Sequence, residues 1–475
     1  MIVTALLAAA TLSAQPAITR GMESKRFTAQ ELMEARYVGI QNKLNAWITE
    51  GKKHVKQVVL VDVNLEPVSI APVAGSGDLE VLAASVTPNR TGLLLVNREG
   101  KKRTVVLRCE VDAESLAMVE PYDTVVAYDY GKKDVCMVWG ATSPSGQYNA
   151  LVSVLQLNET QQYKTYIALF DARMQKIWDK EYPLGSMGDM MVTDDGRIVT
   201  FGEERAEGES HFVFNVLDST RSTTGQASVK CEPMKDFHLT NVVGSHLLAM
   251  GTYHPDGKKA DRLTSGVVAM SFNLDSATIE GFQIRPFQNE DMNIFLNKKT
   301  KKIQKETVTE RIVELGRMAT PYGAVLALGR DMAVEKSSNS GAVSREGYGM
   351  GIHLVAFDTT GRVRWVRNIR RNDKTDDGTL PTLGIASVSD KVCIVKTEHA
   401  KMPAIYEISD EAKQYALGDK GNLVIYTIDP DGNTEKLLLE KKCKQAIFRA
   451  IGCNDGTLLF FGGNGKKLRQ CELRW

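Results

Sequence analysis

Short apolar strands that end in aspartate recur along most of this chain. In the stretch Gly351–Ile369, an apolar run ends at Asp358, a Thr-Thr-Gly turn follows, and a second apolar run carries Trp365. Two such runs on either side of a turn predict a β-hairpin. The pattern occurs seven times, with strands ending at Asp62, Asp112, Asp171, Asp218, Asp275, Asp358 and Asp429.

A second kind of apolar run completes a repeating unit. Successive aspartates lie 50, 59, 47, 57, 83 and 71 residues apart, and tight turns such as Asp194-Asp195-Gly196 lie between them. Most of the intervening apolar runs end in glycine, at Gly140, Gly202, Gly251, Gly329 and Gly462. Each unit therefore predicts four antiparallel strands, which we call a to d in chain order.

A four-stranded unit repeated at this spacing is typical of a β-propeller. We expect an all-β fold, a seven-bladed β-propeller over residues 56–475. The first Asp-ended strand, at 57–62, and the last glycine-ended strand, at 457–462, have no partner within a unit. We expect these two strands to meet in one blade and to close the ring.

The N-terminal region has a different pattern. Residues 2–14 form an apolar stretch that ends in small residues and is too short to span a bilayer. This predicts a signal peptide over residues 1–14, cleaved after Ala14, and hence an exported protein, either periplasmic or at the cell surface. Residues 15–55 are then an N-terminal extension.

An amphipathic helix is expected within that extension, at about residues 28–50. Thr28 followed by Glu31 is a capping-box pattern, and Gly51 is a plausible end. A helical face would be formed by apolar residues spaced three or four apart, namely Met33, Tyr37, Ile40, Leu44 and Trp47. Such a face either docks on the body of the protein or binds a partner.

Charge and cysteine content limit the kinds of partner and metal site that the chain suggests. The chain has 59 Lys and Arg against 58 Asp and Glu, so nothing favours nucleic acid or an anionic membrane as a partner. Its seven cysteines form no C-x-x-C pair, which argues against a metal site. We expect buried free thiols, with one bridge among Cys443, Cys453 and Cys471 as the alternative.

The segment Ala356–Trp365 resembles the Ala-x-Asp-x-x-Thr-Gly-x-x-x-Trp repeat of quinoprotein-like propellers, with one residue fewer between Asp and Trp. Asp171 and Trp178 repeat the same spacing of seven. The resemblance implies the fold and a tryptophan packed between blades, but no quinone cofactor. As a whole, the chain resembles the exported propellers of Bacteroidota, many of which have no assigned activity.

A binding surface is expected where loops are long. Three loops between strands b and c are predicted to share one rim: Ala141–Thr165, Arg330–Met350 and Thr397–Gly421. They are either tolerated insertions or a surface that binds a protein or glycan. The residues suited to such contacts are Tyr148, Tyr163, Arg330, Arg345, Tyr348, His399, Lys401, Tyr406 and Tyr415.

No catalytic motif accompanies this scaffold. The run Gly347–Gly351 precedes a strand and opens no helix, which does not fit a dinucleotide site, and the chain contains no G-x-S-x-G or H-E-x-x-H. We therefore predict a non-catalytic binding scaffold without catalytic residues, metal ligands or cofactor. The alternative is a glycan-active hydrolase or lyase, with carboxylates from several blades converging at the central channel.

Overall fold

The computed structural model of the chain describes most of residues 17–475. The predicted signal peptide, Lys401 and Tyr406 lie outside the described residues. The stretches that are not described are 1–16, 52–53, 74–75, 77, 101, 113–114, 116, 119–121, 161, 185–186, 207–208, 231–233, 254–263, 289–290, 292–293, 296–311, 338–342, 376–382, 400–414, 417–420, 444–445, 454–455 and 464–466.

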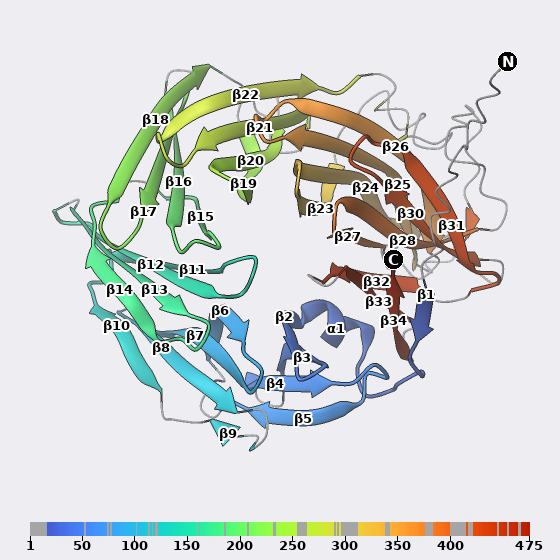
Figure 1. Ribbon diagram of the computed structural model, residues 1–475, viewed down its shortest axis with the longest axis horizontal. Coiled ribbons are helices and arrows are strands. Elements are labelled where there is room, and N and C mark those ends of the chain that lie inside the picture. Colours follow the sequence, from blue (N-terminus) through green and yellow to red (C-terminus); the bar gives the residue numbers. More distant parts are fainter. Residues whose placement is uncertain are drawn as a thin grey trace, which may run out of the picture.

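Eight antiparallel sheets surround a central opening and form a β-propeller (Figure 1). The prediction of four-stranded antiparallel blades is confirmed, whereas the predicted number of seven blades is wrong. The seven Asp-ended strands are the third strands, or strands c, of blades 1 to 7. The eighth blade escaped the pattern because its third strand, β34 (Leu468–Arg474), ends at the C-terminus without an aspartate.

The strands of each blade follow one another from the inside of the ring outwards. Blade 1 contains β2 (Arg36–Gln41), β3 (Leu44–Glu50), β4 (Lys56–Val61) and β5 (Pro67–Pro72), and blade 2 contains β6 (Leu79–Val86), β7 (Arg90–Glu99), β8 (Arg103–Asp112) and β10 (Asp123–Asp129), with β9 (Ala117–Met118) also paired to β8. Blade 3 contains β11 (Val135–Thr142), β12 (Tyr148–Leu157), β13 (Gln162–Asp171) and β14 (Lys176–Glu181). Blade 4 contains β15 (Asp189–Val192), β16 (Ile198–Ala206), β17 (Glu209–Leu217) and β18 (Ser222–Lys230).

Blades 5 to 8 continue the same order. Their strands are β19 (Met234–Val243), β20 (His246–Tyr253), β21 (Gly266–Asn273) and β22 (Thr278–Pro286); β23 (Ile312–Thr320), β24 (Gly323–Ser337), β25 (Val343–Asp358) and β26 (Val363–Thr375), with β29 (Tyr415–Ala416) added; β27 (Gly384–Val388), β28 (Lys391–His399), β30 (Gly421–Ile428) and β31 (Thr434–Glu440); β32 (Ala446–Gly452), β33 (Thr457–Gly463), β34 and β1 (Ala17–Arg20).

The ring is closed in blade 8 by the first strand of the chain. β1 pairs antiparallel with β34, with Thr19 opposite Glu472, and so supplies the outer strand to three C-terminal strands. The predicted closure through the strand at 57–62 is wrong, because that strand is β4, the third strand of blade 1. Closure by both ends of the chain is nevertheless present (Figure 1).

The N-terminal helix is much shorter than expected. Thr28 caps α1 (Ala29–Glu34), and the capping box with Glu31 is present as predicted. The helix ends at Glu34, because Ala35 already has extended backbone angles. Arg449 of β32 donates to the carbonyl oxygen of Ala35 at 2.6 Å and so satisfies this end of the helix.

The rest of the predicted helix is the first hairpin of blade 1. Tyr37 and Trp47, expected on one helical face, lie opposite each other on β2 and β3, with ring centroids 5.0 Å apart. Asn42 and Lys43 make the turn with positive φ angles of 47° and 66°. Such a two-residue turn matches the twist of paired strands.

The recurring aspartate closes the turn between strands c and d. In blade 6, the Asp358 carboxylate accepts hydrogen bonds from the N–H groups of Thr360 and Arg362 at 2.9 and 3.0 Å. The carboxylates of Asp62, Asp171, Asp218 and Asp429 accept backbone hydrogen bonds in the same way. The aspartate therefore recurs because its carboxylate closes the turn between strands c and d.

These c–d turns also lock neighbouring blades together. Met174, in the turn of blade 3, has a φ of 58° and is 1% exposed, since its side chain packs against Gly92 of blade 2. The Trp365 indole donates from blade 6 to the carbonyl oxygen of Pro430 in the turn of blade 7 at 3.1 Å. Trp365 is therefore packed between blades, as the quinoprotein-like resemblance implies.

The two faces of the ring differ in the turns they carry. One face holds the b–c turns and the links from one blade to the next, and we call it the b–c face. The other holds the a–b and c–d turns, and we call it the a–b face. The predicted loop Ala141–Thr165 is largely strand, because Val135–Thr142 is the innermost strand of blade 3 and β12 follows it.

Six cysteines lie among the described residues and form no disulfide there: Cys109, Cys136, Cys393, Cys443, Cys453 and Cys471. Four of them are buried, and burial raises the pKa of the Cys393 thiol to about 12. This agrees with the expectation of buried free thiols. No helix among the described residues has the length and apolar character needed to cross a membrane.

Candidate functional site

The b–c face carries a large hollow beside α1. It has a volume of about 1370 Å³ and lies between α1, the turn joining β3 to β4, the outer strand β5 and the start of β6. Ile70 on β5 lines it and is 46% exposed, while Ile48 and Leu79 contribute buried apolar surface. Exposed apolar surface inside a hollow is typical of a binding site.

Charged groups surround this apolar surface. The lining includes the cations Arg26, Arg36 and Lys56, and more numerous carboxylates, namely Glu31, Glu34, Glu50, Glu66 and Glu80. Several are held in place: Arg26 lies 3.2 Å from Glu66, and Lys56 donates to Glu50 at 2.7 Å. Hydrogen bonds from Lys56 and His54 lower the pKa of Glu50, so this carboxylate is ionised at neutral pH.

A second feature of the same face is an enlarged blade 6. Its strands β24 and β25 are 15 and 16 residues long and run through most of the predicted loop Arg330–Met350. β29, from the predicted loop Thr397–Gly421 of blade 7, pairs in parallel with β26, with Tyr415 opposite Asp373. Two insertions that the sequence placed in separate loops therefore share one five-stranded sheet.

Buried charges fix this enlarged sheet to blade 7. The guanidinium of Arg371 on β26 donates to Asp331 at 3.0 Å and to Asp373 at 3.3 Å. Lys396 on β28 lies 4.0 Å from Asp373 and donates to the carbonyl oxygen of Arg370 at 3.3 Å. Burial raises the pKa of Asp331, although Arg371 opposes the shift. Two cations and two anions thus balance in the interior.

The glycine-rich run before the blade 6 hairpin also has a structural explanation. A Cβ at Gly349 would lie 2.5 Å from the guanidinium of Arg371, so glycine leaves room for the buried cation. Gly351 has a φ of 61° and lies against Ile294 and Phe295 of the link from blade 5. These requirements come from packing and need no phosphate ligand.

The predicted contact residues that the structure describes lie on both faces of the ring. Arg330 and Tyr348 are in the enlarged sheet but are 7% and 5% exposed. Arg345, His399 and Tyr415 lie on strands at the same end of blades 6 and 7. Tyr163 is 44% exposed at the start of β13 on the b–c face, whereas Tyr148 begins β12 on the a–b face.

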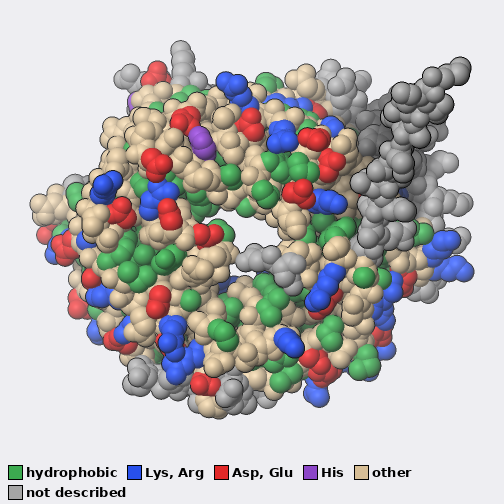
Figure 2. Space-filling model, viewed as in Figure 1, with side chains coloured by type: hydrophobic (Ala, Val, Ile, Leu, Met, Phe, Trp, Pro, Cys, Tyr) green, Lys and Arg blue, Asp and Glu red, His purple; other side chains and the backbone are tan. Residues whose placement is uncertain are grey.

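The central channel also carries polar side chains. Figure 2 shows the opening, with acidic, basic and apolar side chains around its mouth. On the innermost strands, His238 Nδ1 of blade 5 lies 3.3 Å from the Asp189 carboxylate of blade 4, and the His238 side chain is 52% exposed. The Asp189 carboxylate also accepts the Leu239 N–H at 2.8 Å. This pair was not singled out from the sequence, because its members are 49 residues apart.

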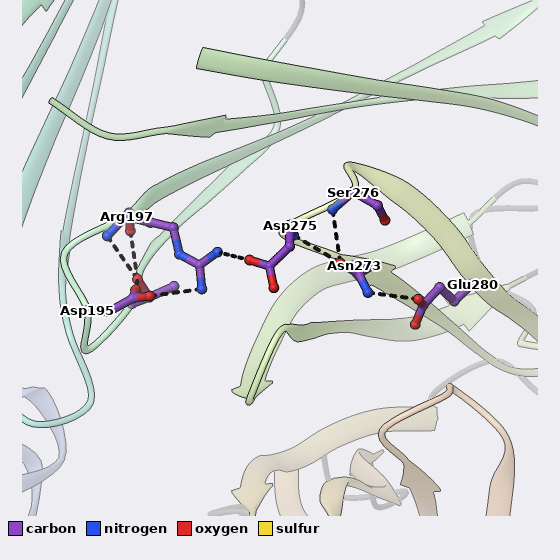
Figure 3. A network of polar contacts seen from close by, with 7 residues as sticks. Asp195, Arg197, Asn273, Asp275, Ser276 and Glu280 are labelled. Carbon is purple, nitrogen blue, oxygen red and sulfur yellow. Dashed lines mark hydrogen bonds and ion pairs between the residues drawn. The ribbon is translucent and has the colours of Figure 1, made fainter. Parts of the chain in front are cut away.

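The most connected polar contacts of the a–b face join two blades (Figure 3). Arg197, in the a–b turn of blade 4, contacts Asp195 and, across the blade boundary, Asp275, each at 2.9 Å. In blade 5, Asn273 closes the turn between strands c and d. It accepts hydrogen bonds from the N–H groups of Asp275 and Ser276. The Arg197–Asp275 ion pair joins blades 4 and 5.

No group of three or more His, Cys, Asp or Glu residues suited to a metal ion occurs in the described part of the chain. Asp429 closes the turn that joins β30 to β31, so its carboxylate is used by the hairpin.

Comparison with known proteins shows no family for this chain. No protein-family model matches the chain, and no curated protein matches its sequence. Solved structures with a similar fold include the β-propeller domain of the Trilobed protease from Pyrococcus furiosus, with 12% identity, coverage of 86% of this chain and 98% of that one, and a TM-score of 0.37. A polysaccharide lyase has 10% identity, coverage of 84% and 90%, and a TM-score of 0.35. A eukaryotic initiation factor has 10% identity, coverage of 97% and 99%, and a TM-score of 0.41.

Proposed function

We propose that this chain is an exported, non-catalytic scaffold that binds a protein or glycan partner on its b–c face. The observation that carries the proposal is the hollow beside α1, because it combines exposed apolar surface with fixed charges. The apolar stretch at residues 2–14 supports export. The enlarged sheet of blades 6 and 7 widens the same face.

The hollow offers what a polymer partner needs. Its volume of about 1370 Å³ exceeds the roughly 300–1,000 Å³ of most small-molecule sites, which fits a segment of chain better than a single metabolite. Ion pairs such as Lys56–Glu50 hold polar groups in fixed positions around the apolar wall. Fixed groups lose less entropy on binding, which favours affinity without any conformational change.

The test compares two substitutions on one exposed strand. Partners are first sought with the full chain on a glycan array and by affinity capture from envelope extract, and the dissociation constant of an identified partner is then measured by calorimetry. Ile70→Asp, inside the hollow, should weaken binding by about tenfold or more. Val68→Asp is the matched control, because Val68 is 59% exposed on the same side of β5 but outside the hollow.

Equal weakening by both substitutions, or none by Ile70→Asp, would remove the hollow from the binding site. If neither screen yields a partner that discriminates between the two variants, the scaffold proposal itself fails. Circular dichroism and thermal melting of both variants show whether β5 still folds.

A second candidate function is supported by the Asp189–His238 pair in the channel. A carboxylate at the Nδ1 side of an imidazole can orient the ring and leave Nε2 to accept a proton, which a glycan-active hydrolase or lyase requires. Turnover of a polysaccharide panel that is lost in both Asp189→Asn and His238→Gln would favour this enzyme. Turnover that persists in both variants would exclude the pair as its catalytic centre.

A further inference from the structure

Four polar side chains form a closed hydrogen-bonded ring where blade 5 joins blade 6. Arg285 of β22 donates to Asp291 at 2.7 Å and to Nε2 of His353 at 3.5 Å. His353 on β25 donates from Nδ1 to Asn368 of β26 at 2.6 Å, and Asn368 donates to Asp291 at 3.4 Å. His353 is 0% exposed, so solvent does not reach its imidazole.

The ring is complete with only one protonation state of His353. A guanidinium can only donate, so Nε2 facing Arg285 must be the acceptor and carry no proton. The Asn368 amide group donates to Asp291, so its oxygen is the acceptor for the proton on Nδ1 of His353. Neutral imidazole with the proton on Nδ1 therefore satisfies every contact.

A second proton on His353 would break this arrangement. It would place an Nε2–H against the Arg285 guanidinium, so that two donors and two positive charges face each other at 3.5 Å. Asp291 lies 3.6 Å from Nδ1 and partly offsets this repulsion. Burial lowers the pKa of His353, while Asn368 and Asp291 oppose the shift and Arg285 adds to it.

Among the described residues, the charged groups in contact with the imidazole come from β22 and from the link between blades 5 and 6. β22 supplies Arg285, and the link between the blades supplies Asp291. β26 supplies neutral Asn368, while β24 places apolar Leu328 in register with His353. Burial alone would raise the pKa of Asp291. The backbone N–H of Gln288 and the side chains of His353 and Arg285 lower this pKa instead, so the Asp291 carboxylate is ionised in mildly acidic solution.

The hydrogen-bonded ring around His353 holds the link that joins blade 5 to blade 6. Asp291 is 3% exposed and belongs to this link, as do Phe287 and Phe295, whose rings lie edge-on to the His353 ring at 5.5 and 6.2 Å. Arg330 of β24 donates to the carbonyl oxygen of Phe295 at 3.2 Å. His353 is thus the centre of the contacts between the link and blade 6.

We propose that this ring is a pH-sensitive latch, which holds the link against blade 6 at neutral pH and releases it when His353 takes up a proton in mildly acidic solution. The latch stands independently of the proposed binding role. Phe287, Asp291 and Phe295 lie between blades 5 and 6 on the b–c face, so their release from His353 changes the shape of that face.

The sign of the pH effect follows from proton linkage. The unfolded or released state binds the proton on His353 more readily, so stability is fully present above the ordinary histidine pKa of about 6.5 and falls as the pH decreases below it. The population of released link should rise by up to about tenfold for each pH unit in that range. The contribution of Asp291 is lost only below its lowered carboxyl pKa, so the two effects separate.

The experiment measures hydrogen exchange of the intact chain by mass spectrometry between pH 7.5 and 5.0, corrected for intrinsic exchange. Peptides spanning Phe287–Phe295 should lose protection below pH 6.5, while peptides from the interior strand β21 should not. His353→Gln keeps one donor and one acceptor without titrating, so it should abolish this pH dependence. His246→Gln is the control, because His246 pairs with Glu280 on the a–b face.

A direct measurement covers the case in which His353→Gln does not fold. In the wild-type protein labelled with ¹⁵N-histidine, the His353 resonances should show the Nδ1-protonated neutral form at pH 7 and a midpoint below 6.5. A midpoint at or above 6.5, the opposite tautomer, or link protection that does not change with pH would each overturn the proposal.

Discussion

Replacement of Arg371 by methionine tests the buried charges that fix the enlarged sheet of blade 6. The guanidinium is about 1% exposed and contacts Asp331 and Asp373, while Lys396 lies 4.0 Å from Asp373. Methionine keeps the apolar length of the side chain but removes its charge. Two carboxylates and one ammonium group then remain in the interior with a net charge of −1.

The expected loss of stability is large because the remaining charges are mostly shielded from water. Asp373 is 3% exposed and the Asp331 side chain 15% exposed. Removing one member of a buried ion pair costs about 3–5 kcal/mol, mostly from the charge left without a partner. We therefore expect Arg371→Met to lower the free energy of unfolding by about 3 kcal/mol or more at pH 7.

The loss should be smaller in acid. The pKa of Asp331 is already raised by burial, and removal of Arg371 raises it further. A folded-state carboxyl pKa above the unfolded value means that the folded state binds the extra proton, so stability decreases as the pH increases through this range. The difference between variant and wild type should therefore be greater at pH 7 than at pH 5.

Urea denaturation followed by tryptophan fluorescence at both pH values measures this difference. Arg103→Met is the matched control, because its guanidinium is 48% exposed and pairs with Glu99 and Asp129 at the surface. That variant should stay within about 0.5 kcal/mol of wild type. If Arg371→Met costs less than 1 kcal/mol at pH 7, or no more than Arg103→Met, the buried network does not stabilise the sheet.

Three further substitutions test local packing, each by urea denaturation. Gly349→Ala should cost about 1–3 kcal/mol, because its Cβ would lie 2.5 Å from the Arg371 guanidinium; an unchanged midpoint would mean that Arg371 is elsewhere. Met174→Gly should also lower the stability of the protein, because the loss of a side chain that is 1% exposed outweighs the roughly 1–2 kcal/mol of backbone strain that glycine relieves at a φ of 58°. A more stable variant would contradict the interblade contact. Asp358→Ala should cost about 1–2 kcal/mol through the lost turn hydrogen bonds, and no cost would show that the aspartate repeat has no turn-closing role.

Much of the fold could be predicted because strand c of each blade ends in a defined turn. Asp358 and its relatives must accept backbone N–H groups, so the same residue type recurs at blade spacing. Blade 8 has no c–d turn, since β34 ends the chain and β1 comes from the other end. A count of aspartates is therefore one short of the number of blades.

The helix was mispredicted because two periods coincide. Tyr37 and Trp47 are ten residues apart, which places them near one face of a helix; in the hairpin, the register shift between Tyr37 and Gly39 also brings them opposite each other. The choice depended on Asn42-Lys43, a turn without glycine that needs positive φ at both residues. Only the packing of Trp47 against Phe461 of blade 8 decides for the strand.

The candidate site depends on contacts that no local pattern encodes. The hollow is assembled from α1 and strands of blades 1 and 2, whose individual sequences are ordinary. Arg330 and Tyr348 were expected in a loop because they lie between the apolar run that ends at Gly329 and the strand that ends at Asp358. Gly349 instead makes room for Arg371, and the strands continue through it.

The most direct test of the eight-bladed ring is a disulfide across its closure. Thr19 and Glu472 lie opposite each other on β1 and β34, so Thr19→Cys together with Glu472→Cys should form an intramolecular bridge on oxidation. Peptide mapping should find that bridge, and the oxidised protein should melt at a higher temperature than the reduced one. Failure to cross-link in the folded protein, or a bridge from position 19 to a cysteine outside β34, would contradict closure of blade 8 by the first strand.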